Sequence, residues 1–321
     1  MRTQVCITID TEFSIGGAFA DPDARQPIGA ANVEQGLDFL LETFRRHEMN
    51  VTYFVETLNA HWFGTGEMGR LVQRILAGGH DVQLHLHPCW TAFGDSAWRE
   101  AVRAAAPNDD CARLGEAELA DLISRGADTL ERMGAPRPIA LRTGNLRAGR
   151  NVYRAMRACG MGVASNVGLA LNRPDDPELR LRGGRHRIEG VLEVPVLTYG
   201  PGERLFTTTA CSSGETEALL RQARRERVPS VVLLTHPFEF TKGDRLDPAP
   251  QRSNRINQKR MERLCAFIAA NPDEFEAVTF AAAAPGWLTA PDVPEPRLTA
   301  PLPRMLARMI QNKANDLVAA L

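Results

Sequence analysis

Three histidines within eight residues, His80, His85 and His87, form the stretch of this sequence best suited to chemistry. Asp81 to His87 is predicted to be a short strand, and because side chains alternate along a strand, His85 and His87 share one face. Pro88 has no N–H to donate to a sheet, so the strand is expected to end there, with the two imidazoles at an open end. Such a pair could bind a metal ion, because imidazole is the commonest metal ligand, or it could be a hydrogen-bonded part of a half-buried strand.

Polar side chains also follow three other apolar runs. Gln4 to Ile9 is predicted to be a buried strand, and it is followed by Asp10 and Glu12, whose i, i+2 spacing places both carboxylates on one face. Arg142 and His236 each follow another apolar run in the same way. One carboxylate with two imidazoles suits a catalytic zinc or similar divalent ion with a position left for water. The second carboxylate could then act as base on that water, and a separate histidine as acid.

The elements that would carry these residues alternate between strand and helix patterns. Strands are predicted at 4–9, 51–55, 81–87, 138–141, 162–164, 191–197, 230–235 and 277–282, and helices at 33–44, 68–76, 119–133, 151–159, 215–227 and 255–270. This rhythm is typical of parallel β/α units joined by right-handed crossovers. About eight strands over this length favour one α/β domain, a regular or distorted β/α barrel, in which functional groups collect at the C-terminal ends of the strands.

The two ends of the sequence suggest a simple domain organisation. Residues 1–284 are assigned to the barrel. Residues 285–321 are assigned to a proline-rich linker and an amphipathic C-terminal helix, which could dock on its own barrel or form a homo-oligomer. No apolar run approaches membrane-spanning length, and the beginning of the sequence does not read as a secretory signal, so we expect a cytoplasmic protein without a transmembrane segment.

The composition narrows the class of partner. A net charge of −1 and a pI of about 6.7 provide no electrostatic surface for nucleic acid, so no nucleic-acid partner is expected. The six cysteines are scattered without a C-x-x-C spacing, which indicates neither a disulfide framework nor a cysteine zinc ribbon and fits a reducing compartment.

The order of these residues resembles the motifs of the polysaccharide deacetylase superfamily, that is, carbohydrate esterase family 4 and its NodB-type relatives. The resemblance covers roughly residues 4 to 283. It includes Thr8-Ile9-Asp10-Thr11-Glu12 for the first motif, Gly79 to His85 for the second, Leu141-Arg142-Thr143-Gly144-Asn145 for the third, and Leu233-Leu234-Thr235-His236-Pro237 for the last. The resemblance implies a distorted β/α barrel of about seven to eight mostly parallel strands. It also implies a divalent metal ion, with zinc as the expected metal.

The resemblance further implies a role for each residue. Asp10 would be the catalytic base, oriented by Arg142, and His236 the acid that protonates the leaving group. Glu12, His85 and one further residue would bind the metal. The family usually has that further ligand, a histidine, four residues after the second-motif histidine, where this chain has Cys89. Either His87 takes its place, which we favour, or Cys89 contributes a thiolate.

The function that the resemblance implies is metal-dependent removal of an acetyl group from an N-acylated sugar or sugar precursor, in surface polysaccharide metabolism. The substrate would be a small molecule or an oligosaccharide. Two alternatives stay open. One is a non-catalytic, carbohydrate-binding pseudoenzyme that keeps the barrel and has a weakened metal site. The other is a hydrolase that uses the same machinery on a non-sugar amide.

Overall fold

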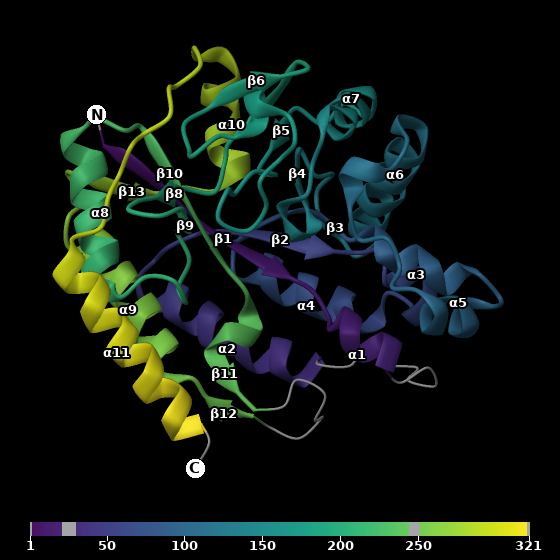
Figure 1. The fold of residues 1–321 in the computed structure, drawn as a ribbon, viewed down its shortest axis with the longest axis horizontal. Coiled ribbons are helices and arrows are strands. Elements are labelled where there is room, and N and C mark those ends of the chain that lie inside the picture. Colours follow the sequence, from purple (N-terminus) through teal and green to yellow (C-terminus); the bar gives the residue numbers. More distant parts are fainter. Residues whose placement is uncertain (1, 21–29, 244–250, 320–321) are drawn as a thin grey trace.

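A curled, mostly parallel sheet forms the centre of the computed structural model, which describes residues 2–20, 30–243 and 251–319 (Figure 1). Within these residues, its parallel strands follow the order β10-β1-β2-β3-β4-β5-β7. Their bounds are β1 Thr3–Thr11, β2 Thr52–Glu56, β3 Asp81–Leu86, β4 Ala140–Thr143, β5 Val163–Ala164, β7 Val191–Glu193 and β10 Ser230–Thr235. At the margins, β6 (His186–Ile188) pairs antiparallel with β7, and β13 (Phe275–Ala277) pairs parallel with β1. The parallel strands are therefore joined as successive β/α units.

The sheet curls until its two edges approach each other. Beyond β7, the backbone N–H of Leu197 donates to the carbonyl of Val232 in β10 at 3.0 Å, and the N–H of Leu234 donates to the carbonyl of Phe206 at 3.0 Å. Two short hairpins lie outside the sheet, β8 (Thr198–Tyr199) with β9 (Arg204–Leu205), and β11 (Thr241–Lys242) with β12 (Arg252–Ser253). The molecule is a distorted β/α barrel, as predicted.

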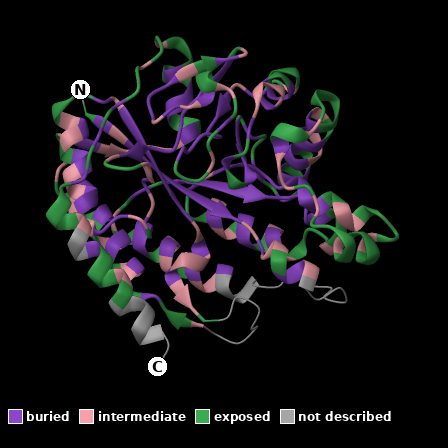
Figure 2. Ribbon diagram, in the orientation of Figure 1, coloured by how far each residue is buried: buried purple, intermediate pink, exposed green. Residues whose placement is uncertain are grey.

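Helices surround the barrel, and their inward faces complete its core. They are α1 Ile15–Ala20, α2 Ala30–Arg46, α3 Ala60–Phe63, α4 Gly66–Ala77, α5 Trp98–Ala104, α6 Glu116–Arg132, α7 Arg150–Ala158, α8 Ser213–Arg225, α9 Arg255–Ala269, α10 Phe280–Thr289 and α11 Leu302–Ala319. Short 3-10 turns are η1 Pro88–Gly94, η2 Cys111–Arg113, η3 Gly144–Leu146, η4 Pro177–Leu179 and η5 Pro237–Phe240. Figure 2 shows the central strands of the sheet buried and the outward helix faces exposed, so the polar ends of these strands are held by a rigid, apolar frame.

Most predicted elements are confirmed, and two differ for identifiable reasons. The strand predicted at 191–197 ends at Glu193, before Pro195, which has no N–H for a ladder. The strand predicted at 277–282 is wrong beyond Ala277, because the side chain of Thr279 accepts a hydrogen bond from the N–H of Ala282 and caps α10. An alanine-rich run after a good N-cap forms a helix more readily than a strand.

The C-terminal residues fold back on the barrel. α10 continues through Pro285, so the extended segment begins after Thr289. α11 then packs on α8, where Arg308 forms a buried ion pair of 3.2 Å with Glu215. The division at residue 284 and a homo-oligomer formed through this helix stay predictions. No helix among the described residues is both long and apolar enough to cross a membrane.

Gly36 controls how closely α2 approaches the turn η5, which begins directly after His236. A Cβ atom at this position would lie 1.8 Å from the carbonyl oxygen of Pro237, far inside van der Waals contact. We expect Gly36→Ala to lower stability by about 1 to 3 kcal/mol, because the backbone of η5 must move. Gly286→Ala is the matched control, since a Cβ there meets nothing within 4 Å. Thermal unfolding of both variants tests this, and equal melting temperatures would contradict it.

Candidate functional site

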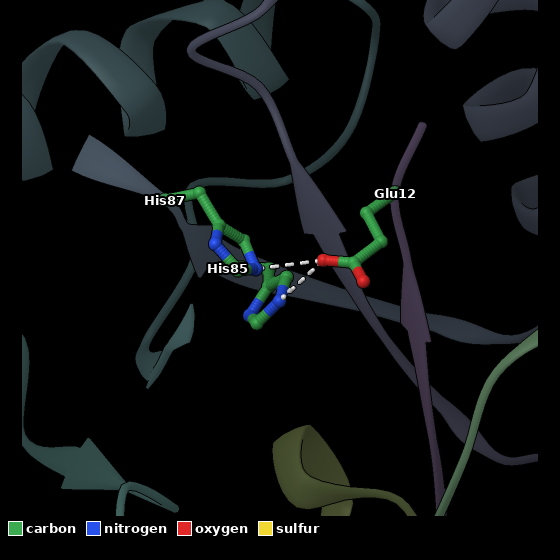
Figure 3. Close-up of side chains that lie close together, drawn as sticks. All are labelled: Glu12, His85 and His87. Atoms are coloured by element: carbon green, nitrogen blue, oxygen red, sulfur yellow. Dashed lines mark hydrogen bonds and ion pairs between the residues drawn. The ribbon is translucent and has the colours of Figure 1, made fainter. Parts of the chain in front are cut away.

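Glu12, His85 and His87 converge at the C-terminal ends of β1 and β3. One carboxylate oxygen of Glu12, Oε2, lies 3.2 Å from Nε2 of His85 and 2.7 Å from Nε2 of His87 (Figure 3). Both histidines are buried, and the Glu12 side chain is 17% exposed. Their donor atoms all lie within 4.8 Å of one another. The structure therefore brings together the three residues that the sequence singled out as metal ligands.

The ring of His85 is held from behind by β4. His85 and Arg142 are register partners on neighbouring strands, and Nδ1 of His85 donates to the carbonyl oxygen of Arg142 at 2.8 Å. A carbonyl can only accept, so in the neutral ring the proton lies on Nδ1 and the lone pair lies on Nε2. That lone pair is directed at the Glu12 carboxylate.

His87 lies between two carboxylates. Its Nε2 faces Glu12, and its Nδ1 lies 3.0 and 2.9 Å from the two oxygens of Asp109. Burial alone would lower the pKa of His87, but the charges of Glu12 and Asp109 outweigh burial and raise that pKa well above its usual range. Burial likewise opposes ionisation of Glu12, yet His87 and His85 hold the pKa of Glu12 well below its usual range.

Asp10 and Arg142 form a buried ion pair beside this cluster. The guanidinium donates to Asp10 Oδ1 at 2.7 Å, to the Thr8 hydroxyl at 2.9 Å, and to the carbonyl and hydroxyl oxygens of Ser165 at 3.1 and 2.8 Å. The Arg142 side chain is fully buried, and its guanidinium carbon lies 4.2 Å from the centre of the Phe54 ring. Arg142 is therefore fixed on every side, and it fixes Asp10.

A second buried carboxylate supports the loop that holds Arg142. Glu193, at the end of β7, accepts hydrogen bonds from the N–H groups of Asn166 and Val167 and from the hydroxyl of Tyr153. Burial is the main reason that the pKa of Glu193 rises to about 7. Its partners hold the backbone immediately after Ser165 in place, so we assign Glu193 a structural part in the site.

His236 follows β10, and its partner is Glu239 rather than Asp10. Nδ1 of His236 lies 3.0 Å from Glu239 Oε1, and the other Glu239 oxygen accepts from the hydroxyl of Thr235 at 2.7 Å. Burial would lower the pKa of His236, but Glu239, together with Glu12 and Asp10, raises it to about 9. His236 is therefore protonated at neutral pH and lies within the electrostatic range of both carboxylates of β1.

Cys89 is buried at the start of η1, in a second group with His87 and Asp109. Burial is the main reason that the pKa of its thiol rises to about 12, so the group is a neutral thiol near pH 7. Cys89 is absent from the group that contains Glu12 and His85. The geometry favours His87 over Cys89 as the partner of His85.

A pocket of about 370 Å³ opens over the cluster. Its polar side is formed by Glu12, His87, Asp109 and Asn145, and its apolar side by Phe13, Ile15, Val33 and Phe238. This volume lies within the range of pockets that bind small molecules. A ligand in this pocket would therefore contact Glu12 and His87 directly.

The donor set fits a divalent metal ion. Glu12 supplies a carboxylate oxygen and the two histidines supply Nε2 atoms, which is a common ligand set for catalytic zinc, and a metal ion would displace the proton that the raised pKa keeps on His87. In the neutral ring of His85 the proton lies on Nδ1, which leaves the Nε2 atom free to bind a metal. The residues present therefore match the expected ion without rearrangement of His85.

Comparison with known proteins supports the fold. No family model matches the sequence, and no curated protein matches it either. A protein from Mycobacterium smegmatis assigned as a polysaccharide deacetylase aligns in structure with a TM-score of 0.58 and 17% identity, over 93% of this chain and 94% of that one. The chain has the fold of the polysaccharide deacetylases.

Two further solved structures align with this chain at lower TM-scores. A family 4 carbohydrate esterase from Streptomyces lividans, in complex with acetate, gives a TM-score of 0.43 and 14% identity over 86% of this chain and 91% of its own. A mutant of a family 4 pseudoenzyme with restored activity gives a TM-score of 0.45 and 14% identity over 88% and 67% of the two chains. A shared fold does not decide function, which depends on the residues of the site.

Sequence reasoning missed two carboxylates that contact the site histidines. Glu239 lies three residues after His236, and this spacing within a turn is a signal that could have identified it. Asp109 lies in the long connection after β3, 22 residues beyond His87, and no spacing rule connects the two. Only the fold of that connection brings Asp109 to the site.

Proposed function

We propose that the protein is a metal-dependent deacetylase that removes an acetyl group from an N-acylated sugar or sugar precursor, in surface polysaccharide metabolism. The observation that carries the proposal is the approach of one Glu12 oxygen to Nε2 of both His85 and His87, at 3.2 and 2.7 Å. The buried Asp10–Arg142 pair supports it, because Asp10 leaves β1 only two residues before Glu12.

In this proposal, Glu12, His85 and His87 hold the ion, and zinc is the expected metal. When bound, a divalent ion supplies Lewis-acid polarisation of the acyl carbonyl and makes water a better nucleophile near neutral pH. Asp10 accepts the proton from the attacking water, and Arg142 keeps the Asp10 carboxylate in one orientation. His236, held protonated by Glu239, donates a proton to the departing nitrogen.

We further propose that the enzyme acts in the cytoplasm. The six cysteines, all of them within the described residues, are free thiols, and free thiols persist in a reducing compartment. The polar and apolar sides of the pocket suit an acylated sugar of small size.

Metal analysis of the wild-type chain, purified without chelators, together with acetate release from small N-acetyl sugars, tests the function. We expect one divalent ion per chain and acetate formation that stops when the ion is removed and resumes on its return. A chain that binds no ion would overturn the enzyme function and favour the pseudoenzyme. One bound ion with hydrolysis of only non-sugar amides would overturn the sugar substrate.

His236 should determine the alkaline limit of activity. The acid must be protonated, so activity should fall as the pH rises through its pKa of about 9. Glu239→Gln removes the charge that raises this pKa, so the fall should occur at lower pH. Because folding raises the pKa of His236, the protonated ring stabilises the folded state. This stabilisation is complete at pH values below the usual pKa of histidine and is lost as the pH rises towards 9. A ring-proton titration by NMR, beside the pH profile of kcat/KM, measures both effects. An unchanged alkaline limb would contradict the assignment.

A further inference from the structure

The ring of His87 is held by Asp109, a carboxylate from the long connection that follows β3. Nδ1 of His87 lies 3.0 and 2.9 Å from the two oxygens of Asp109, while Nε2 faces Glu12. We propose that Asp109 is a positioning residue that orients His87 as a metal ligand and fixes the proton on its Nδ1 atom. This inference rests on the function proposed above.

The two histidines are held in parallel ways by different acceptors. His85 donates through Nδ1 to a backbone carbonyl, and His87 has Asp109 at the corresponding nitrogen. In a neutral imidazole one nitrogen carries the proton, so an acceptor at Nδ1 leaves the Nε2 lone pair free for a metal. A carboxylate acceptor also makes the ring a stronger base, and therefore a stronger ligand, than a carbonyl does.

His87 needs this support more than His85 does. β3 ends at Leu86, so His85 lies within the sheet ladder, whereas His87 lies in the backbone just beyond it. A ligand outside the ladder has no neighbouring strand to fix its ring. Asp109 supplies that restraint, which explains how the H-x-H spacing can stand in for a histidine at position 89.

Asp109 is itself held by a loop built around the His87 ring. The side-chain amide of Asn145 donates to Asp109 Oδ2 at 2.8 Å. Asn145 adopts a left-handed backbone conformation, with φ of 54°, which is uncommon outside glycine although asparagine tolerates it better than most residues. At the preceding Gly144, a Cβ atom would lie 2.3 Å from Nδ1 of His87. The turn therefore leaves room for the ring and directs an amide at its carboxylate.

Metal affinity of substituted chains tests the proposal. The variants are Asp109→Ala, which removes the acceptor, Asp109→Asn, which keeps one acceptor oxygen, and Asn145→Ala, which removes the amide that supports Asp109 and also places alanine in a left-handed conformation. Asp110→Asn is the matched control, because this neighbouring carboxylate caps η2 by accepting from the N–H of Ala112. Zinc affinity is measured by chelator competition, ion content by elemental analysis, and ligand geometry by the visible spectrum of the cobalt-substituted protein.

We expect Asp109→Ala to weaken zinc binding by about 10- to 100-fold and to change the cobalt spectrum, with one ion still bound at saturation. Asp109→Asn and Asn145→Ala should weaken binding less, and Asp110→Asn should leave it unchanged. An unchanged zinc affinity in a folded Asp109→Ala chain would overturn the proposal, as would a raised KM alone, which would make Asp109 a substrate contact. Two ions in the wild type, with one lost in Asp109→Ala, would instead make Asp109 a ligand of a second ion. A wild-type chain that binds no ion would overturn the proposed function itself.

Discussion

Asp10→Asn is expected to lower kcat by about 10²- to 10⁴-fold while the chain keeps its single divalent ion. Asparagine retains an oxygen that can accept from Arg142, but it cannot take a proton from water. In the proposed function the metal ligand is instead Glu12, two residues later, whose oxygen faces both histidines. Turnover and metal content, measured on the same sample, separate the base from the ligand.

Ser165→Ala is the control for this substitution. Its hydroxyl accepts from the guanidinium of Arg142 at 2.8 Å, on the side away from Asp10. The variant disturbs the same buried network without removing the base, so kcat should change little. Loss of the ion in Asp10→Asn would show that Asp10 is a ligand and that the two carboxylates have exchanged roles.

Arg142→Met is expected to lower the free energy of unfolding by about 3 to 5 kcal/mol, because it leaves the buried carboxylate of Asp10 without its counter-charge. Methionine has a similar length and can pack on Phe54, so lost volume contributes little. Thermal and urea unfolding measure the loss.

Arg150→Met provides the comparison, since Arg150 makes three ion pairs, with Asp176, Glu178 and Glu189, near the surface. Water screens exposed pairs and solvates their partners when they break, so stability should change little. A larger loss from Arg150→Met than from Arg142→Met would show that the number of ion pairs matters more than burial.

The fold was predictable because its signals are local and repeated. Apolar runs such as Val231 to Leu234 are buried on both faces, as strands of a parallel sheet between helices must be. The wrong prediction of a strand at 277–282 also rests on a local signal, because a run of apolar and small residues after Val278 fits a strand or a helix equally well. Thr279, whose side chain caps α10, decides between them through a contact that periodicity does not record.

The site was predictable to the extent that it lies on strands. Asp10, Glu12, His85 and Arg142 come together because parallel strands end at the same edge of a sheet. Their neighbours on loops were not predictable in this way. Asp109 reaches His87 across 22 residues of turns and short helices, and its position depends on the packing of that whole connection.

Arg142 joins the two halves of the site through different parts of one residue. Its backbone carbonyl accepts from His85, and its guanidinium holds Asp10. A shift of β4 would therefore act on the hydrogen bonds of both Asp10 and His85, so the two halves of the site respond to the same strand. Substitution of the Arg142 side chain, in contrast, would remove the hydrogen bonds to Asp10, Thr8 and Ser165 and leave the backbone acceptor of His85 in place. The two contributions of Arg142 are thus separable, because substitution removes the guanidinium that holds Asp10 and keeps the carbonyl that holds His85.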